Sequence, residues 1–128
     1  DTLGFSAAGA VISKGATAFI GIGSGAVTST EAYANFYVPI GGTIQNLRVY
    51  VSANASGNAG NTCTIRKGGS SQTLLVSYGA GTTGLLADTA NSFTVVAGDV
   101  IAVQFVNTGS GGGTKDIVVE SVSMEISA

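Results

Sequence analysis

The stretch that decides the fold is SFTVVAGDVIAVQFV, which runs from Ser92 to Val106. Apolar and polar residues alternate on either side of a short break at residues 97–99. A period of two places successive side chains on opposite faces of an extended backbone, so each half is predicted to be a β-strand. Gly98 tolerates the positive φ of a tight turn, and Asp99 can bond its own nearby amides. The stretch therefore predicts a hairpin, in which two strands joined by one tight turn pair with each other.

The second half of this stretch is predicted to be a central strand. Ile101, Val103 and Phe105 share one face, and the opposite face is also largely apolar. Strands that are buried on both faces form near-continuous apolar runs. We therefore expect this strand to lie between other strands and beneath a covering layer.

The composition restricts the classes of function. The chain has 128 residues and a net charge of −2, and only 9% of its residues are charged, against about 25% in a typical soluble domain. This length fits one domain with a single core. The basic residues are few and scattered, so the electrostatic footprint of a nucleic-acid-binding protein is missing. No apolar run approaches the roughly 18 residues of a membrane-spanning helix. We expect neither a nucleic-acid partner nor a membrane span.

Residue types that usually carry catalysis and metal binding are scarce. There is no histidine, and Cys63 is the single cysteine. Ser-His-Asp catalysis, Cys-His catalysis and the usual zinc sites are therefore excluded by composition. The acidic residues flank turns or lie apart on strands, which favours neither a carboxylate pair for hydrolysis nor a calcium site. We expect no enzyme activity, no cofactor and no bound metal.

The N-terminal segment is apolar and rich in glycine. Five glycines between positions 4 and 23 disfavour a helix, because each costs about 1 kcal/mol relative to alanine. Two strands are predicted instead, near residues 2–13 and 17–22. The first strand could belong to its own sheet, or it could complete the sheet of a neighbouring copy by β-strand addition. In the second case residues 1–22 form an assembly arm, and residues 23–128 form the folded domain.

The arm hypothesis assigns a subunit interface to four large apolar side chains. They are Leu3, Phe5, Val11 and Ile12. Burying each of them in a neighbour would contribute about 1.5–3 kcal/mol to the assembly. Removal of residues 1–13 is then expected to leave a folded domain that no longer assembles.

The rest of the chain alternates between strand patterns and Gly-rich turns. Strands are predicted at EAYANFYVPI (31–40), GTIQNLRVYVSA (42–53), CTIRK (63–67), TLLVSY (73–78) and KDIVVESVSMEIS (115–127). Pro39 should end the first of these, because proline donates no ladder hydrogen bond. Residues 79–91 are predicted to be a polar loop, in which Leu85 and Leu86 cover one end of the core.

This pattern of about nine short strands separated by turns indicates an all-β antiparallel fold. A closed up-and-down barrel would also fit the pattern. The unequal loops favour Greek-key crossovers between two sheets, as in a jelly roll. We therefore predict a jelly-roll-like sandwich of two antiparallel sheets, with an extended apolar N-terminal strand.

Three motifs also carry a resemblance to known proteins. They are GTIQNLRVYVSA (42–53), CTIRKGG with TLLVSYGAGTTG (63–84) and DTANSFTVVAGDVIAVQFV (88–106). Together they resemble a repeated block of phage fibre, virion and secreted bacterial proteins, and they are similar in outline to the trimeric globular heads of collagen-like proteins. The likeness covers residues 39–126 and implies a jelly-roll domain. It brings no catalytic residue with it.

The leading functional hypothesis is a structural subunit that assembles with copies of itself into an extracellular filament, fibre or virion shell. Few charges weaken the repulsion between copies, and few lysine and proline residues guard the strand edges. The composition favours a location outside a cell, on its surface or in a virion. A chain that begins at Asp1, as after removal of a leader, points the same way.

The alternative hypothesis is a carbohydrate-binding or receptor-binding head. Tyr33, Tyr37 and Tyr50 could stack against a surface glycan if they share one face, since an aromatic ring offers an apolar face and a polar tip. Separately, Asn54-Ala55-Ser56 matches the acceptor pattern for N-glycosylation, a short pattern that often arises by chance.

Overall fold

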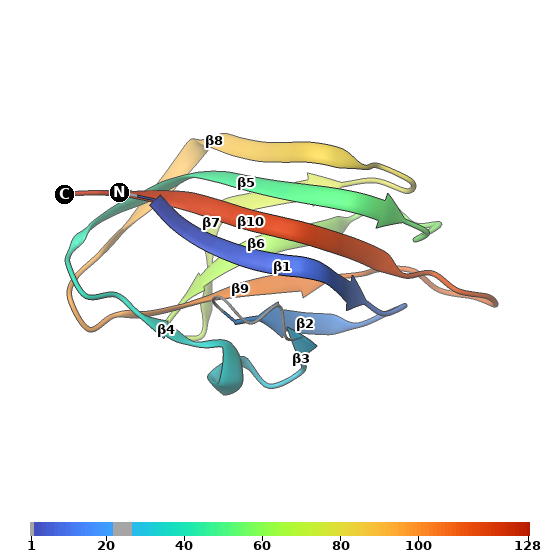
Figure 1. The fold of residues 1–128 in the computed structure, drawn as a ribbon, viewed down its shortest axis with the longest axis horizontal. Helices are drawn as coiled ribbons and strands as arrows, with labels where there is room; N and C mark the ends of the chain where they lie inside the picture. Colours follow the sequence, from blue (N-terminus) through green and yellow to red (C-terminus); the bar gives the residue numbers. More distant parts are fainter. Residues whose placement is uncertain (1, 22–26) are drawn as a thin grey trace.

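The computed structural model describes residues 2–21 and 27–128, with side chains described from residue 9 onward. These residues form an antiparallel sandwich of two packed sheets (Figure 1). Sheet A has four strands in the order β1-β10-β5-β8. Their bounds are Thr2–Ile12 for β1, Ile117–Ser127 for β10, Gly42–Asn54 for β5 and Gly84–Val95 for β8.

Sheet B follows the order β3-β2-β9-β6-β7, and the short strand β4 also pairs with β9. The bounds are Val27–Thr28 for β3, Thr17–Ile20 for β2, Val100–Val106 for β9, Asn61–Lys67 for β6, Ser70–Tyr78 for β7 and Phe36–Tyr37 for β4. A short 3-10 helix, η1 (Glu31–Ala34), precedes β4.

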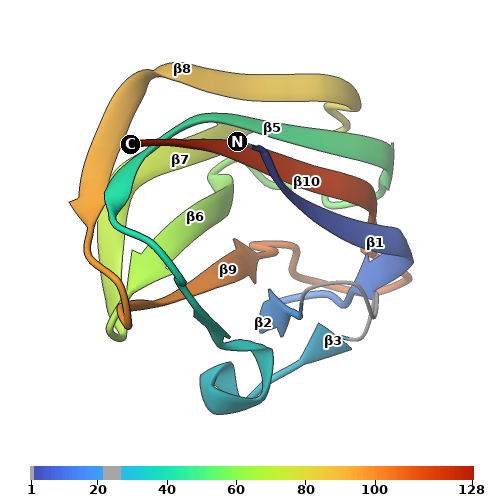
Figure 2. The same cartoon turned by 60° about the vertical axis from the view of Figure 1, so that its left-hand side comes forward.

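Consecutive strands mostly cross from one sheet to the other. The chain changes sheets between β1 and β2, β4 and β5, β5 and β6, β7 and β8, β8 and β9, and β9 and β10. By contrast, β6 and β7 form a hairpin within sheet B (Figure 2). An up-and-down barrel would instead pair each strand with the next one along the chain. The predicted jelly-roll-like sandwich is therefore confirmed.

The core lies between the sheets, and strand alternation decides which residues fill it. In β5, Leu47, Val49 and Val51 are fully buried, whereas Arg48 and Tyr50 between them are exposed. This is the alternation that a sheet with one covered face requires. The inward face predicted for this strand is confirmed.

Strand β9 occupies the centre of sheet B, as predicted. It pairs with β6 along one edge and with β2 and β4 along the other. Ile101, Val103 and Phe105 belong to the main core, and Ala102 packs with Phe19 of β2 and Ala34 of η1. Because Ala102 has the opposite parity, this second cluster lies on the outer face of sheet B. The 3-10 helix is thus the covering layer expected over β9.

Three predictions of local structure are wrong. The sequence predicts a strand over residues 31–40, but residues 31–34 form η1, and none of these four residues is β-branched. The predicted loop at residues 79–91 is a strand from Gly84 onward, because pairing with β5 satisfies its backbone hydrogen bonds although Leu85 faces solvent.

The two strands of residues 92–106 do not pair with each other, because β8 lies in sheet A and β9 in sheet B. Ile22, the predicted end of the second strand, lies outside the described residues.

Each of the three long edge strands carries the same irregularity. In β8 the four steps from Asp88 to Ser92 span only two steps of β5, between Leu47 and Gln45. Strand β7 departs from β6 by the same amount, and so does β1 from β10. Such bulges break the even row of edge amides and carbonyls and increase the local twist. They are one of the devices by which natural sheets blunt their edges.

Candidate interaction surface

The structure separates the three tyrosines that could form one stacking platform. Tyr50 is 44% exposed on the outer face of sheet A, where it lies opposite Leu85 of β8. Tyr33 and Tyr37 are 81% and 67% exposed, and both lie on the η1–β4 segment of sheet B. Tyr50 is therefore on the other side of the sandwich from Tyr33 and Tyr37.

The η1–β4 segment runs beside the turn that joins β8 to β9. Val38 donates its amide to Asp99 O at 2.8 Å and accepts from the Gly98 amide at 2.8 Å. The chain continues along this turn, because Gly41 lies against the backbone of Val95 and Val96. Ile40, just before Gly41, is 49% exposed, and the turn residue Val96 is 66% exposed. We call Tyr33, Tyr37, Ile40 and Val96 together the tyrosine patch. It holds half of the large hydrophobic side chains that the described part of the chain exposes, and such a concentration typically marks a contact surface.

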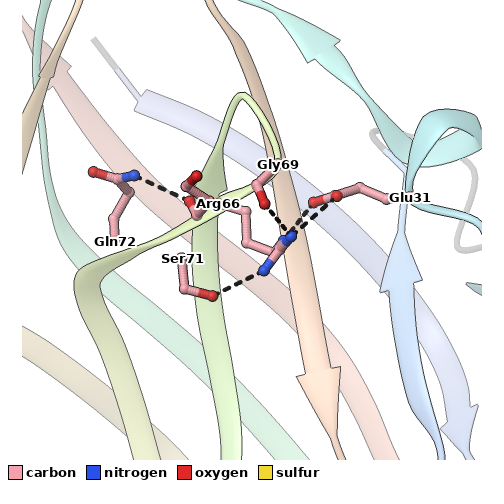
Figure 3. A network of polar contacts seen from close by, with 6 residues as sticks. Glu31, Arg66, Gly69, Ser71 and Gln72 are labelled. Atoms are coloured by element: carbon pink, nitrogen blue, oxygen red, sulfur yellow. Dashed lines mark hydrogen bonds and ion pairs between the residues drawn. The ribbon is translucent and has the colours of Figure 1, made fainter.

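A polar network anchors η1 at the edge of this patch (Figure 3). Glu31 accepts from Arg66 Nε at 2.6 Å and from its terminal nitrogen at 3.3 Å. Arg66 also donates to Ser71 Oγ at 2.9 Å and to the carbonyl of Gly69. Arg66 lies on β6 and Ser71 on β7. The 3-10 helix is thereby tied to the β6–β7 hairpin.

A groove of about 760 Å³ lies between the edge strands β7 and β8. Asp88, one of its lining residues, is buried and accepts from the backbone amides of Leu75, Ala90 and Asn91, at 3.0–3.1 Å. The Asn91 side chain donates to the same carboxylate. Burial alone would raise the pKa of Asp88, but these hydrogen bonds outweigh burial and hold the pKa below its ordinary value.

The bonds to Asp88 define what this carboxylate does. Four of them come from Ala90 and Asn91 and close the bulge of β8, and the bond from Leu75 links sheet A to sheet B. Its oxygens are occupied by these donors, so the group acts as a structural acceptor. In residues 2–21 and 27–128, no three His, Cys, Asp or Glu side chains gather as a metal site would require. The same residues contain no helix long and apolar enough to cross a membrane.

The residues predicted for a subunit interface lie on a strand of the domain itself. Strand β1 pairs with β10 of the same chain from Thr2 to Ile12 (Figure 1). Ile12 is buried in the main core, and Val11 is exposed on the opposite face. The side chains of Leu3 and Phe5 lie outside the described residues. Because Ile12 fills the core, we now expect removal of residues 1–13 to lower the melting temperature.

Asn54, the candidate glycosylation site, stands at the end of β5 far from the tyrosine patch. Its side-chain nitrogen donates to the carbonyls of Gly79 and Thr82, both at 3.0 Å. Its side-chain oxygen accepts from the Ser56 amide at 3.0 Å. The bonds to Gly79 and Thr82 hold the end of β5 against the connection between β7 and β8, and the bond to Ser56 shapes the loop that follows β5.

Ile40, Val96 and the Glu31–Arg66 pair were not among the sequence predictions. A signal for Val96 exists, because two consecutive valines at 95 and 96 interrupt the alternation and one of them must face outward. Ile40 is flanked by Pro39 and Gly41, residues typical of a turn, which indicates exposure. The ion pair joins residues 35 positions apart, so no local sequence pattern predicts it.

No protein-family model and no curated protein sequence matches this chain. Among solved structures, a similar one is the crystal structure of Podospora anserina GH26-CBM35 β-(1,4)-mannanase, with a TM-score of 0.48 and 16% identity. The match covers 99% of this chain and 28% of that chain. A likeness this distant is one between β-rich folds.

Proposed function

We propose that this chain is a structural domain that associates with copies of itself on an extracellular or virion surface, through the tyrosine patch. The supporting observation is the patch itself, where two tyrosines, an isoleucine and a valine stand exposed on adjacent segments. The resemblance of residues 39–126 to fibre and virion proteins supports the same class of function. The domain carries out no catalysis in this proposal.

The chemistry of the patch favours a protein partner. Ile40 and Val96 are aliphatic, and tyrosine is enriched at protein interfaces because its ring is buried while its hydroxyl finds a partner. None of the four patch residues is charged, and the net charge of the chain is only −2. A second copy therefore meets little electrostatic repulsion there.

The mode of contact that we propose is face packing. The sequence hypothesis invoked β-strand addition, which needs an even row of free amides and carbonyls along a sheet edge. The bulges of β1, β7 and β8 interrupt that row on each long edge. The tyrosine patch needs no such row, because side chains supply the contact.

Light scattering over a range of protein concentrations tests this proposal. We expect the wild-type chain to associate, and Ile40→Ser with Tyr37→Ser to weaken association by about tenfold or more, because each buried apolar side chain contributes about 1.5–3 kcal/mol. Tyr50→Ser is the matched control, since Tyr50 is an exposed tyrosine on the other side of the sandwich. A wild-type chain that stays monomeric up to millimolar concentration would exclude the proposal.

Glycan binding is the second candidate function. The exposure of Tyr33 and Tyr37 on one segment favours it, because two rings presented together can stack on sugar rings. Calorimetric titration with a panel of soluble polysaccharides tests this candidate. Binding that is lost in Tyr33→Ala and kept in Tyr50→Ala, by a chain that stays monomeric, would select it over self-association.

A further inference from the structure

Arg66 is held ready for a carboxylate by its own hairpin. Its guanidinium group donates to Ser71 Oγ and to the Gly69 carbonyl, both within the β6–β7 hairpin (Figure 3). These two bonds fix the plane of the guanidinium group before any partner from η1 arrives. A fixed guanidinium fork matches the two oxygens of a carboxylate.

Glu31 is the partner that uses this fork. Its two oxygens meet two different nitrogens of Arg66, at 2.6 and 3.3 Å, and both side chains are mostly buried. Within residues 2–21 and 27–128 no other ion pair occurs. The remaining described lysines and acidic groups with hydrogen bonds bind neutral groups, as Lys67 does at the Thr94 carbonyl. The ion pair of this weakly charged chain therefore attaches η1, which contains Glu31, to β6, which contains Arg66.

That element is the start of the segment that carries both patch tyrosines. Glu31 is the first residue of η1, and Ala34, its last residue, is buried against Phe19 and Ala102. Tyr33 stands between these two attachment points, and its amide donates to Thr30 O at 3.1 Å. Tyr37 follows on β4. The ion pair and the buried alanine therefore fix η1 at its two ends.

We infer that Glu31 and Arg66 are positioning residues of the tyrosine patch, which hold η1 in one orientation so that Tyr33 and Tyr37 meet a partner already aligned. This inference rests on the proposed function of the patch. Groups that are ordered before binding lose less conformational freedom when the partner arrives, so affinity rises. Neither residue needs to touch the partner.

The test compares Glu31→Ala with Ser71→Ala in the full chain. The first variant removes the link to η1 and leaves Arg66 bonded to its hairpin. The second removes one of the two hairpin bonds that orient Arg66 and leaves the Gly69 bond and the link to Glu31 in place, so it shows how much of the effect requires the link itself. Hydrogen exchange of the Tyr33 amide reports the order of η1 without any partner, and light scattering reports association.

We expect Glu31→Ala to speed exchange at Tyr33 and to weaken association by about fivefold, the scale of a partly buried ion pair. Glu31→Gln, which keeps the shape and one acceptor, should fall between this variant and the wild type. Ser71→Ala keeps the Gly69 bond and the link to Glu31, so it should lose less than Glu31→Ala in both measurements.

Three outcomes overturn the inference. Faster exchange at Tyr33 with unchanged association shows that order in η1 is not needed, and the proposed function survives. An equal loss in Ser71→Ala assigns the effect to the hairpin. A wild-type chain that neither associates nor binds a glycan removes the proposed function first, and the inference falls with it.

Discussion

Strands β8 and β9 are consecutive in the sequence but occupy different sheets and different positions within them. Four residues, Val96 to Asp99, separate them, yet β8 is an edge strand of sheet A and β9 is the centre of sheet B. Strand β9 keeps even pairing with β6 over six residues, whereas β8 bulges against β5. Strand β9 is apolar on nearly both faces, whereas β8 carries polar residues such as Asp88 and Asn91 between its apolar ones, in keeping with their places in the sheets.

Strands β8 and β9 are stabilised by different interactions. Strand β9 is covered on both faces, so its contribution comes from apolar burial at Phe105 and its neighbours. Strand β8 has one free edge and few buried side chains, and the carboxylate of Asp88 holds its bulge together. One strand depends on packing, and the other depends on hydrogen bonds to a single charged group.

Replacing Phe105 with alanine tests the packing of β9 and should have the largest effect. Phe105 is fully buried, and the change should lower the free energy of unfolding by about 3–5 kcal/mol, since it loses apolar burial and leaves a cavity. Denaturant melts measure this loss. Gln104→Ala, on the outer face of the same strand, is the control. A loss below about 1 kcal/mol would mean that β9 does not depend on packing in the way argued.

Replacing Asp88 with alanine tests the hydrogen-bonded bulge of β8. The amides of Leu75, Ala90 and Asn91 would lose their acceptor, and a buried group without a partner costs about 1–3 kcal/mol. Urea melts of this variant and of Asp88→Asn, which keeps one acceptor oxygen, should give a graded loss. Equal stability of all three chains would contradict the role assigned to the carboxylate.

The pH dependence of the same site sharpens the contrast with β9. The folded-state pKa of Asp88 is lowered, so its charge stabilises the fold fully above the unfolded-state pKa of about 3.9. That stability is lost as the pH falls through the lower folded-state pKa. Melts between pH 6 and pH 2 should therefore show a steeper acid loss for the wild type than for Asp88→Asn. Parallel curves would count against the argument.

Replacing Asp99 with alanine tests the turn between the two strands. Asp99 accepts from the Val96 amide at 2.9 Å in an exposed position, and we expect a loss of about 0.5–1.5 kcal/mol. Asp99→Asn retains an acceptor and should lose less. Calorimetric melts resolve the difference. If alanine costs nothing, the change of sheets does not need this side-chain bond.

Replacing Tyr78 with phenylalanine should cost no stability, and it is the one change here that could raise the free energy of unfolding. Its hydroxyl group is buried, and within the described part of the chain it has no hydrogen-bond partner. Burial also raises its pKa. Since an unpaired buried hydroxyl costs stability, the variant should be as stable as the wild type or up to about 1–2 kcal/mol more stable. A clear loss in thermal melts would reveal a partner for the hydroxyl.

The sequence allowed prediction of faces better than of partners. Leu47, Val49 and Phe105 are buried as predicted, because a period of two depends only on neighbouring residues. The pairing of β8 with β5 was missed, since alternation does not say which strand lies alongside. In the candidate surface Tyr33 and Tyr37 were predicted, but their separation from Tyr50 depends on which sheet each strand joins.

The hydrogen bonds of Asn54 mean that glycosylation at this residue has to precede folding of the loops around it. Attachment of an N-linked glycan takes place at the side-chain nitrogen of asparagine, and in the folded domain that nitrogen already donates to Gly79 and Thr82. A sugar can therefore be added only before the loops at this end close. A glycosylated Asn54 keeps one N–H on that nitrogen, so at least one of the two bonds would be lost. The fraction of chains glycosylated at Asn54, measured by mass spectrometry, would therefore report how slowly those loops close during synthesis.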